Sequence, residues 1–368
     1  MKVFLFDNSE LRPDFLPLVY TRSIADLRLG IFSFRQRWFW FSNSDANLLE
    51  VDSIVDKADL LVSSHAVVTK EFVELAINLA EGTSIWMGDL LLARKGGLEL
   101  SPEENRIQYK LTYLNTIWDL TEKAQKVLTS DITLIRKRKY AFDIEDKHTI
   151  VYRKNKVFVE EGVITKAAIL NAENGPIFLA KNAKILEGAV IYGPAYIGEN
   201  TIVGANSKLL GGTYIGGNCV VGGEVKRSYI QSNSNKAHDG YMGDSVLGEW
   251  CNLGAGTNIS NLKNNFGDIK MWSYKESEIV DSGRWKAGVL MGDYCKTSIG
   301  SRINSGTTMG VGTVIFSPEL TNKFYDNFSW GSEKFDFDKF IDSAQKMWEV
   351  NKFEASDKLI GLLEELYQ

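Results

Sequence analysis

Apolar residues recur at a fixed spacing through the middle of the chain. From residue 179 one occurs every six positions, at Leu179, Ile185, Ile191, Ile197, Val203, Leu209, Ile215 and Val221. Glycine directly follows several of them. A period of six fits neither the 3.6-residue repeat of a helix nor the two-residue alternation of a strand. It fits a short strand and a tight turn, repeated so that one side chain of each strand points inward.

Three six-residue steps make one triangular coil, and stacked coils bury a continuous apolar column. The pattern is preceded by Val157, Val163 and Ile169 and resumes at Tyr241, Leu247, Leu253, Ile259, Met291, Thr297, Ile303, Met309 and Ile315. The sequence therefore predicts a left-handed parallel β-helix over residues 141–318. Residues 223–240 and 260–290 exceed the repeat, so we expect them to leave the column as loops. Loops on a rigid scaffold often carry functional residues.

The segments on either side of the repeat have different patterns. Residues 1–140 read as a mixed α/β domain with a buried strand at 1–6, an amphipathic helix at 70–80 and a strand entering a helix at 84–96. Residues 319–368 carry apolar residues at helical spacing, and Ser356 is a plausible N-cap. We expect two short helices there that cap the open end of the β-helix, because an exposed strand edge invites aggregation.

Composition and charge narrow the class of protein. The 368 residues are 44% hydrophobic and 24% charged, with a net charge of -5, which argues against a general nucleic-acid or membrane-surface binder. No apolar run is long enough to span a membrane, and Asp7, Glu10 and Asp14 interrupt the start of the chain, unlike a signal peptide. The three cysteines are odd in number and lack metal-type spacing. We therefore expect a reduced, cytoplasmic protein.

Residues 223–261 contain the most distinctive motif, GEVKRSYIQSNSNKAHDGYMGDSVLGEWCNLGAGTNISN. His238 follows Glu224 by 14 residues and precedes Tyr241 by three, and an Asn-Leu-Gly-Ala-Gly-Thr run comes after them. The imidazole of a histidine has an ordinary pKa near 6.5, which suits it to take a proton at neutral pH. A lone histidine in a turn is usually only a surface residue, so the fixed spacing around His238 carries this interpretation.

This motif resembles the acetyltransferase half of the bifunctional N-acetylglucosamine-1-phosphate uridyltransferase and glucosamine-1-phosphate acetyltransferase family. Residues 15–31, 281–300 and 328–331 are similar to a variant branch of that family, so the resemblance covers nearly the whole chain. It implies a transferase that moves an acetyl group from acetyl-CoA to the amine of glucosamine 1-phosphate, in the synthesis of UDP-N-acetylglucosamine. It also implies a homotrimer with acyltransferase sites between its subunits.

The resemblance also implies roles for individual residues. His238 would be the general base, oriented by Glu224, and Ala255 would contact the acetyl donor. Backbone N–H groups at residues 254–256 would stabilise the tetrahedral oxyanion. The implied ligands of the amino-sugar phosphate are Lys208, Lys226, Tyr241, Asn252, Asn261 and Lys270, with the lysines on the phosphate.

Three positions depart from the family pattern or allow a second interpretation. Lys263 and Lys270 are both candidates for one phosphate-binding lysine, because residues 261–270 read NLKNNFGDIK where the family has Asn-Tyr-Asp-Gly before it. Ile299 stands where the family has a serine that contacts the acetyl donor. Asn252 is equally compatible with an inward asparagine ladder.

The family's N-terminal domain joins a sugar 1-phosphate to UTP, using a glycine-rich loop, a lysine and a carboxylate that holds Mg²⁺. Here residues 5–22 replace that loop and contain no glycine. Arg22 and Arg28 would bind phosphate in place of the missing lysine, or serve as ion-pair partners. Asp89 would be the nucleotide-site and Mg²⁺-binding carboxylate. Since the domain is also short, the sequence favours a reduced or diverged nucleotidyltransferase.

Two other functions remain compatible with the sequence. The chain could be a sugar-1-phosphate nucleotidyltransferase whose β-helix serves only for trimerisation, or a non-catalytic protein that binds a sugar phosphate. Binding of CoA would separate acetyl transfer from the second alternative. Glucosamine 1-phosphate and galactosamine 1-phosphate are not distinguished, because they differ only in the orientation of one hydroxyl group.

Overall fold

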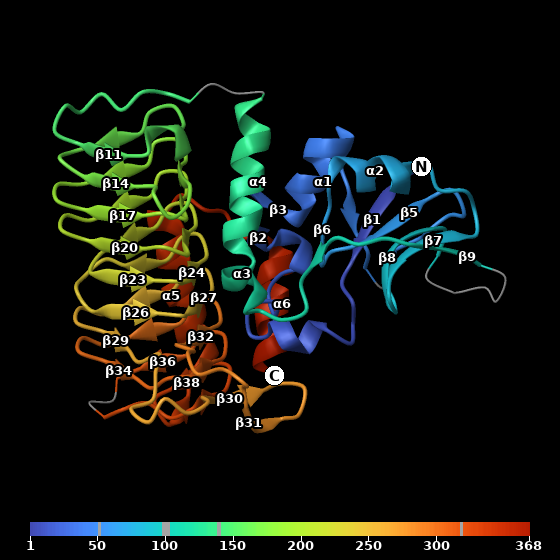
Figure 1. Cartoon of the computed structure of the whole chain (residues 1–368). Helices are drawn as coiled ribbons and strands as arrows, with labels where there is room; N and C mark the ends of the chain where they lie inside the picture. Colours follow the sequence, from blue (N-terminus) through green and yellow to red (C-terminus); the bar gives the residue numbers. More distant parts are fainter. Residues whose placement is uncertain (51–52, 98–103, 138–140, 317–318) are drawn as a thin grey trace. The chain divides into compact units, whose positions relative to one another are not determined.

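The computed structural model describes residues 1–50, 53–97, 104–137, 141–316 and 319–368. These residues form two compact units (Figure 1). Unit 1 comprises Met1–Phe15 and Arg22–Leu120, and unit 2 comprises Leu16–Thr21 and Thr121–Gln368. The chain therefore passes into unit 2 for one short segment before it completes unit 1.

Unit 1 is built around a six-stranded mixed sheet with the order β4-β1-β5-β8-β7-β9. Its strands are β1 (Val3–Phe6), β4 (Asn47–Leu48), β5 (Leu60–Ser63), β7 (Thr83–Met87), β8 (Leu90–Lys95) and β9 (Asn105–Gln108). Trp38 of α1 (Phe34–Ser42) and Phe72 of α2 (Lys70–Ile77) are buried in its core. The smaller elements are η1 (Arg12–Phe15), η2 (Ile24–Asp26), β2 (Arg28–Leu29), β3 (Phe32–Ser33), β6 (Ala66–Val67) and β10 (Thr112–Tyr113). The short helix α3 (Asp119–Glu122) contains the point at which the chain passes from unit 1 to unit 2. The predicted mixed α/β domain is confirmed.

Residues 84–96 form a β-hairpin, so the predicted strand entering a helix is wrong. β7 and β8 pair antiparallel, and Gly88 and Asp89 make the turn between them, with φ of 61° at Gly88. Residues 92–94 are buried in succession because β8 lies between β5 and β7 in the sheet. A continuous apolar run of this kind reads alike for a buried strand and a buried helix.

Unit 2 contains the predicted β-helix, whose strands lie in three parallel sheets (Figure 1). Sheet 1 is formed by β11 (Ile150–Tyr152), β14 (Ile169–Asn171), β17 (Val190–Tyr192), β20 (Lys208–Leu210), β23 (Glu224–Lys226) and β26 (Tyr241–Gly243). Sheet 2 is formed by β12 (Val157–Val159), β15 (Ile177–Leu179), β18 (Ala195–Ile197), β21 (Thr213–Ile215), β24 (Tyr229–Ile230), β27 (Val246–Leu247), β32 (Leu290–Met291), β35 (Thr308–Met309) and β37 (Phe324–Tyr325). Sheet 3 is formed by β13 (Ile164–Thr165), β16 (Lys184–Ile185), β19 (Ile202–Val203), β22 (Val220–Val221), β25 (Asn235–Lys236), β28 (Asn252–Leu253), β33 (Lys296–Thr297), β36 (Val314–Ile315) and β38 (Ser329–Trp330). At its end β39 (Glu333–Lys334) adds to β38 in the antiparallel direction.

The inward side chains of these strands form one continuous apolar core. Those predicted from the six-residue period, such as Leu179, Ile185, Ile191 and Val203, are completely buried. The β-helix predicted from the sequence is therefore confirmed.

Residues 223–240 do not leave the β-helix as a loop, which corrects the expectation from the repeat. They form β23, β24 and β25, one in each sheet. The coil is shorter than 18 residues: Val221 pairs with Lys236, and Val225 pairs with Met242. Met242 is consequently the buried inward residue, and Tyr241 points outward instead of filling the predicted inward position.

An insertion leaves the coil within the predicted range 260–290, although Val289 and Leu290 at its end already belong to the β-helix. Much of this insertion is an antiparallel hairpin of β30 (Lys270–Ser273) and β31 (Glu278–Asp281). Its two ends meet where Leu262 bridges to Lys286 and where Ala287 N donates to Asn261 O at 3.1 Å. The coil before the insertion ends in β29 (Asn258–Ile259), which pairs with β34 (Arg302–Ile303) beyond it.

A stack of aromatic rings follows the outer face of sheet 2. The rings of Phe158, Phe178, Tyr196, Tyr214 and Tyr229 lie 4.5 to 5.4 Å apart, centroid to centroid, and all are buried. Helix α4 (Ala124–Arg136) lies beside this sheet (Figure 1), and the guanidinium of its last residue donates to Val157 O at 2.9 Å. The helix thus belongs to the β-helix unit. A short 3₁₀ helix, η3 (Lys154–Lys156), precedes β12.

At one corner of the β-helix, the residue type at the left-handed position differs between the early and the late coils. Its early left-handed positions hold asparagines whose side chains form an exposed hydrogen-bonded ladder, Asn182 to Asn200 to Asn218 to Asn233. Later left-handed positions hold buried aromatics, Trp250, Tyr294 and Phe328. The C-terminal helices α5 (Phe337–Val350) and α6 (Asp357–Tyr367) pack on these aromatic rings. The two predicted helices and the Ser356 N-cap are confirmed, but the helices cover a corner and do not cap the open end.

Residues 16–21, part of the stretch that replaces the glycine-rich loop, pack on the β-helix. The Thr21 hydroxyl donates to the carboxylate of Asp293, which is buried and also accepts from Glu249 N at 2.8 Å. The ring of Tyr20 meets the edge of Tyr274 in the 260–290 insertion, with centroids 5.8 Å apart. This segment is therefore a structural contact of unit 2.

Candidate active site

The outer face of sheet 1 brings several predicted site residues into one row. Lys208 on β20 pairs with Glu224 on β23, and Glu224 pairs with Tyr241 on β26. Their neighbours Val225 and Met242 are completely buried in the core, so the three side chains of this row point outward. Residues far apart in the sequence thus lie on three consecutive coils, about 4.8 Å apart in the direction of stacking.

Lys208 and Lys226 are the cations of this face. Lys208 is exposed and Lys226 is half-buried. In the part of the chain that the structure describes, neither ammonium group has a carboxylate within ion-pair distance. Lysines that the protein itself does not neutralise can bind a phosphate of a ligand.

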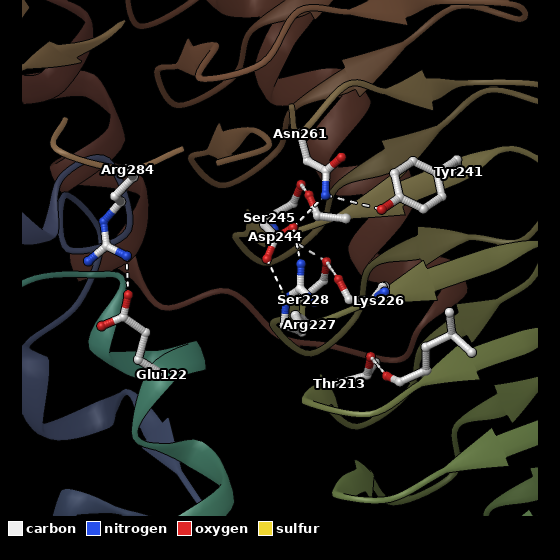
Figure 2. A network of polar contacts seen from close by, with 12 residues as sticks. Glu122, Thr213, Lys226, Arg227, Ser228, Tyr241, Asp244, Ser245, Asn261 and Arg284 are labelled. Atoms are coloured by element: carbon white, nitrogen blue, oxygen red, sulfur yellow. Dashed lines mark hydrogen bonds and ion pairs between the residues drawn. The ribbon is translucent and has the colours of Figure 1, made fainter. Parts of the chain in front are cut away.

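A hydrogen-bonded network lies beside this row (Figure 2). Asn261 donates through Nδ2 to the Tyr241 hydroxyl at 3.1 Å and also to the carboxylate of Asp244. Asp244 in turn accepts from the guanidinium of Arg227 at 2.6 and 2.8 Å. The network joins two predicted substrate-binding residues, Tyr241 and Asn261, that are 20 positions apart in the sequence.

Gly243 makes room for this arrangement. A Cβ atom at Gly243 would lie 2.3 Å from the Tyr241 hydroxyl oxygen and 2.7 Å from Asn261 Nδ2. Any side chain there would therefore push these two groups apart. Burial and the nearby Asp244 carboxylate raise the pKa of Tyr241. The phenol consequently stays protonated at neutral pH and can donate a hydrogen bond.

Arg227 and Asp244 are residues of this network to which the sequence analysis assigned no role. A signal for them was present, because Asp244 lies in the 223–261 motif three residues after Tyr241, and Arg227 follows Lys226 directly. Their pairing depends on the register of the coils, which the sequence does not give. Lys226 lies opposite Gly243, so the residues that follow them, Arg227 and Asp244, come next to each other. The bidentate ion pair orients the carboxylate that holds Asn261.

His238 lies at the corner between β25 and β26, not on a projecting loop, and its side chain is exposed. The corner stacks closely on the preceding coil, since a Cβ atom at Gly222 would lie 2.3 Å from Ala237 O. Glu224 N donates to Gly240 O at 3.2 Å, so Glu224 lies next to this corner. Among the described contacts no hydrogen bond joins the Glu224 carboxylate to the imidazole. Catalytic hydrogen bonds are often formed only when substrate is bound.

The Gly-Ala-Gly turn at residues 254–256 follows the His238 corner by one coil. Gly256 N donates to Asp239 O and Gly254 N donates to Thr297 O, both at 3.1 Å. Two of the three predicted oxyanion donors are therefore already bonded within the protein. Among the described residues, no acceptor faces Ala255 N–H, which leaves it as the donor available to a ligand.

The remaining substrate-binding candidates lie elsewhere. Asn252 is exposed on sheet 3, where it pairs with Asn235 and Lys296, so it is not part of an inward ladder and not on the face of Lys208. Lys270 is exposed on the hairpin strand β30. The alternative lysine, Lys263, donates to the Asp268 carbonyl within the same insertion. The structure thus gathers the candidates of sheet 1 and leaves these three apart from that row.

In unit 1 a carboxylate lies in the loop after β1, where the resemblance implies nucleotide phosphates. Asp7 accepts from Arg12 at 2.6 Å, from the Ser23 hydroxyl at 2.8 Å and from Ile24 N at the start of η2 at 3.2 Å. These are the kinds of donor that usually hold a phosphate. The protein's own anion therefore occupies them.

The other nucleotide-site candidates of unit 1 are not gathered into one place. Arg28 donates to the nearby Ile31 carbonyl. Burial raises the pKa of the Asp26 carboxyl, and the positive charges of Arg35 and Arg22 oppose that rise. Asp89 is exposed in the turn between β7 and β8. Among the described residues no group of three His, Cys, Asp or Glu side chains could hold a metal ion.

The two other histidines of the chain, His65 and His148, differ in setting. His65 is buried against Phe15 and Tyr113, with Nδ1 at 2.9 Å from Leu114 O, while Nε2 accepts from Asn8 N at 3.2 Å. Because Nε2 accepts, Nδ1 carries the proton, and burial lowers the pKa of His65. It is a structural residue. His148 is exposed before β11.

The fold and the site together define a β-helix of the hexapeptide-repeat type with a nucleotidyltransferase-like unit before it. Residues 3–139 match the family described as "Sugar nucleotidyl transferase", and residues 176–211 match the family described as "Bacterial transferase hexapeptide (six repeats)". Both parts of the chain are thus related to transferases. No helix among the described residues is long and apolar enough to cross a membrane.

Curated relatives agree with this class. The chain is similar to the "Bifunctional sugar-1-phosphate nucleotidylyltransferase/acetyltransferase" of Sulfurisphaera tokodaii, with 35% identity over 27% of this chain and 24% of that protein. It is similar to the "Bifunctional protein GlmU" of Methanocaldococcus jannaschii, with 37% identity over 27% of this chain and 26% of that protein. The matches thus span about a quarter of the length of these relatives. The resemblance to bifunctional sugar-1-phosphate transferases is confirmed.

A solved structure, that of the polySia-specific acetyltransferase NeuO, aligns with 58% of this chain and 98% of its own, at 12% identity and a TM-score of 0.25. A likeness of this degree carries no argument about the site.

Proposed function

We propose that the β-helix transfers an acetyl group from acetyl-CoA to the amine of an amino-sugar 1-phosphate, with glucosamine 1-phosphate as the leading substrate. The observation that carries this proposal is the row of Lys208, Glu224 and Tyr241 on three consecutive coils, with Lys226 beside it and His238 at the adjoining corner. The row offers unneutralised cations, hydrogen-bonding groups and a base on one surface. The curated relative of Sulfurisphaera tokodaii, whose name includes acetyltransferase, supports the same chemistry.

His238 is assigned as the general base. The amine nitrogen attacks the thioester carbonyl, a C–N bond forms, and the imidazole takes the proton that the amine must lose. The tetrahedral intermediate then breaks its C–S bond, and the proton passes to the departing CoA sulfur. Ala255 N–H, on the next coil, is the donor that would face the oxyanion.

Lys208 and Lys226 are assigned to the phosphate of the sugar, and Tyr241 and Asn261 to its hydroxyl groups. The Asp244 and Arg227 pair fixes the orientation of Asn261, so that amide is held ready before the sugar binds. A preorganised donor loses less side-chain entropy on binding than a mobile one.

The site requires more than one copy of the chain in this proposal. Asn252 and Lys270 lie away from the row on sheet 1, on sheet 3 and on the hairpin of the insertion. A neighbouring copy in a homotrimer could bring its own Asn252 and acetyl-CoA contacts to this row. Hexapeptide β-helices expose flat sheet faces, which suit assembly around a threefold axis.

Uridylyl transfer by unit 1 is the second candidate function, and the match of residues 3–139 to the sugar nucleotidyl transferase family favours it. The bonded Asp7 carboxylate after β1 counts against it, because it would repel the phosphates of UTP. We therefore assign the principal activity to the β-helix. A non-catalytic sugar-phosphate-binding role would leave the His238 corner and Ala255 N–H without a use.

The experiment that tests the proposal follows the release of free thiol from acetyl-CoA in the presence of glucosamine 1-phosphate. Wild type should turn over, and His238→Ala should lose about 10²-fold or more of kcat because the general base is gone. His148→Ala is the matched control, since His148 is exposed far from the row on sheet 1, and it should retain the wild-type rate.

Galactosamine 1-phosphate is run in parallel to identify the preferred epimer. If wild type releases no thiol with either sugar, while UTP and N-acetylglucosamine 1-phosphate yield pyrophosphate, the β-helix is a scaffold and unit 1 is the enzyme. Absence of both activities, with binding of the sugar phosphate retained, would instead favour the non-catalytic alternative.

A further inference from the structure

Lys236 lies inside the β-helix, where the aligned inward positions of sheet 3 carry uncharged side chains. It is 1% exposed and pairs with Val221 of the preceding coil. The inward residues of neighbouring sheet 3 strands include Ile185, Val203 and Leu253. An ammonium group in such an interior costs free energy unless it is hydrogen-bonded. Burial accordingly lowers the pKa of Lys236 to about 8.

The ammonium group of Lys236 reaches two backbone carbonyls that lie on different coils. Nζ donates to His238 O at 2.7 Å and to Gly222 O at 2.9 Å. Gly222 belongs to the coil before, directly after β22, and His238 lies two residues beyond Lys236 at the corner. One buried side chain therefore ties the peptide of His238 to the coil beneath it.

The rest of this corner is held by backbone contacts with the following coil. Asp239 O accepts from Gly256 N at 3.1 Å, and Tyr241 N donates to the Asn258 side chain at 2.9 Å. Gly240 has φ of 125°, a conformation that favours glycine, and its site is too close to Thr257 O for a Cβ atom. Both neighbours of Gly240 are thus fixed, while among the described contacts the His238 carbonyl is held by Lys236.

We propose that Lys236 is a positioning residue for the acetyl transfer: by holding the carbonyl of His238 from inside the β-helix, it fixes the direction in which the exposed imidazole points. This inference rests on the proposed function, in which His238 is the general base. Lys236 touches neither substrate nor acetyl donor, because it is enclosed within the coil. Its contribution is geometric, and small misplacements of a catalytic group are costly to the rate.

The test is Lys236→Met. Methionine is unbranched, fills nearly the same volume and matches the buried Met242, Met291 and Met309 of the same core. Lys236→Met leaves Gly222 O and His238 O without this donor, but it also removes the cost of burying a charge, so the two effects oppose each other and the melting temperature should stay near that of wild type. We expect kcat to fall about 10- to 100-fold, with KM for the sugar phosphate changed less than about threefold.

Val203→Ala is the matched control, because it disturbs the same inward row two coils away without touching the corner. It should lower the melting temperature through the cavity it creates and leave kcat within about twofold. The inference is overturned if Lys236→Met keeps kcat within about twofold, or if its loss of rate appears only together with a loss of stability like that of Val203→Ala.

A second measurement reads the position of His238 without any turnover. The chain has three histidines, so the ring Cε1–H signals in a proton–carbon NMR spectrum are few, and His238→Ala identifies the one from His238. Lys236→Met should shift or broaden that signal while the signals of His65 and His148 stay in place. Unchanged chemical shifts for all three rings would overturn the inference.

The two measurements separate this inference from the proposed function. If wild type releases no thiol from acetyl-CoA, the proposed function fails, and the NMR spectrum alone decides whether Lys236 positions His238. If wild type is active and His238→Ala is not, but neither kcat nor the His238 signal responds to Lys236→Met, the function stands and Lys236 is a packing residue.

Discussion

Two regions of the chain carry cations, hydroxyl groups and N–H groups of the kinds that bind phosphate, and they use them differently. After β1 in unit 1, Arg12, the Ser23 hydroxyl and Ile24 N all bind the chain's own Asp7 carboxylate. On sheet 1 of the β-helix, Lys208 and Lys226 have no carboxylate within ion-pair distance among the described residues. The donors of the unit 1 loop are bonded to a carboxylate of the chain itself, whereas the lysines of sheet 1 remain available to a ligand.

The difference indicates where an anionic ligand can bind with net gain. A phosphate that enters the unit 1 loop must displace a bonded carboxylate or tolerate it at short range, and both cost free energy. A phosphate on sheet 1 meets two lysines that have no ion-pair partner among the described residues, so its binding adds charge-assisted contacts without breaking an ion pair seen there. Presence of the right residue types is therefore a poor guide to a site unless their existing partners are known.

The largest expected effect comes from removing the two cations of sheet 1. Lys208→Met combined with Lys226→Met should lower kcat/KM for the sugar phosphate roughly 10²- to 10⁴-fold, since each charge-assisted contact contributes about 1.5–3 kcal/mol. The measurement is thiol release over a range of sugar phosphate concentrations. The matched control is Lys166→Met with Lys184→Met, two exposed lysines on sheet 3 and its turn, which should stay within about twofold.

A loss equal to that of the control pair would break the comparison, because it would show that unneutralised lysines on sheet 1 contribute no more than ordinary surface lysines. Calorimetric titration with glucosamine 1-phosphate checks the same point without turnover. Weakened binding in the sheet 1 pair alone would assign the phosphate to these two residues.

Much of the β-helix could be predicted because its six-residue period is a direct consequence of one inward side chain per strand. The inward positions Leu179, Ile185 and Ile191 follow from this period alone. The shortened coil at 223–240 could not be predicted from it, since Val225 and Ile230 lie at spacings of four and five. The strict period therefore placed Tyr241 inward, where the structure has Met242.

The shortened coil at residues 223–240 also limited how much of the site could be predicted from the sequence. The residue types at His238, Tyr241 and Asn261 were identified from the motif, but their partners depend on coil length. Once the coil is 17 residues long, as between Glu224 and Tyr241, Asp244 also lies one coil before Asn261. A single position of error in register would place these side chains on opposite faces of the sheet.

Unit 1 offers the next prediction, which tests whether Asp7 is bound as an internal ligand. Asp7→Asn keeps the shape of the side chain but weakens its bonds to Arg12, Ser23 and Ile24 N, so unit 1 should lose about 1–2 kcal/mol of stability. Native-state hydrogen exchange at the amides of β1 measures this loss within the whole chain. Asp45→Asn, at an exposed aspartate, is the control and should change protection by less than about 0.5 kcal/mol.

Equal protection in the two variants would mean that Asp7 is not held in the loop, and the loop would then be open to a ligand's phosphate. The distinction between the two regions would disappear in that case. A clear loss in Asp7→Asn alone would establish that the donors of unit 1 are engaged in folding and are unavailable for nucleotide binding.

The smallest expected effect concerns the network that joins Tyr241 to Asn261. Tyr241→Phe removes the hydroxyl that accepts from Asn261 Nδ2 at 3.1 Å, while Asn261 keeps its bond to Asp244. Since one neutral hydrogen bond contributes about 0.5–1.5 kcal/mol, kcat/KM should fall only about 2- to 12-fold in the thiol-release assay. Tyr192→Phe, an exposed tyrosine of β17 on the same sheet, is the control and should leave kcat/KM unchanged.

The size of this effect decides how the network acts. If Tyr241 binds the sugar directly as well as Asn261, its loss should raise KM and exceed the loss of a single internal bond. If it only steadies the Asn261 amide, the Asp244 carboxylate and its Arg227 partner compensate, and the change stays near twofold. A response identical to Tyr192→Phe would remove Tyr241 from the site and leave the lysines of sheet 1 as its recognition elements.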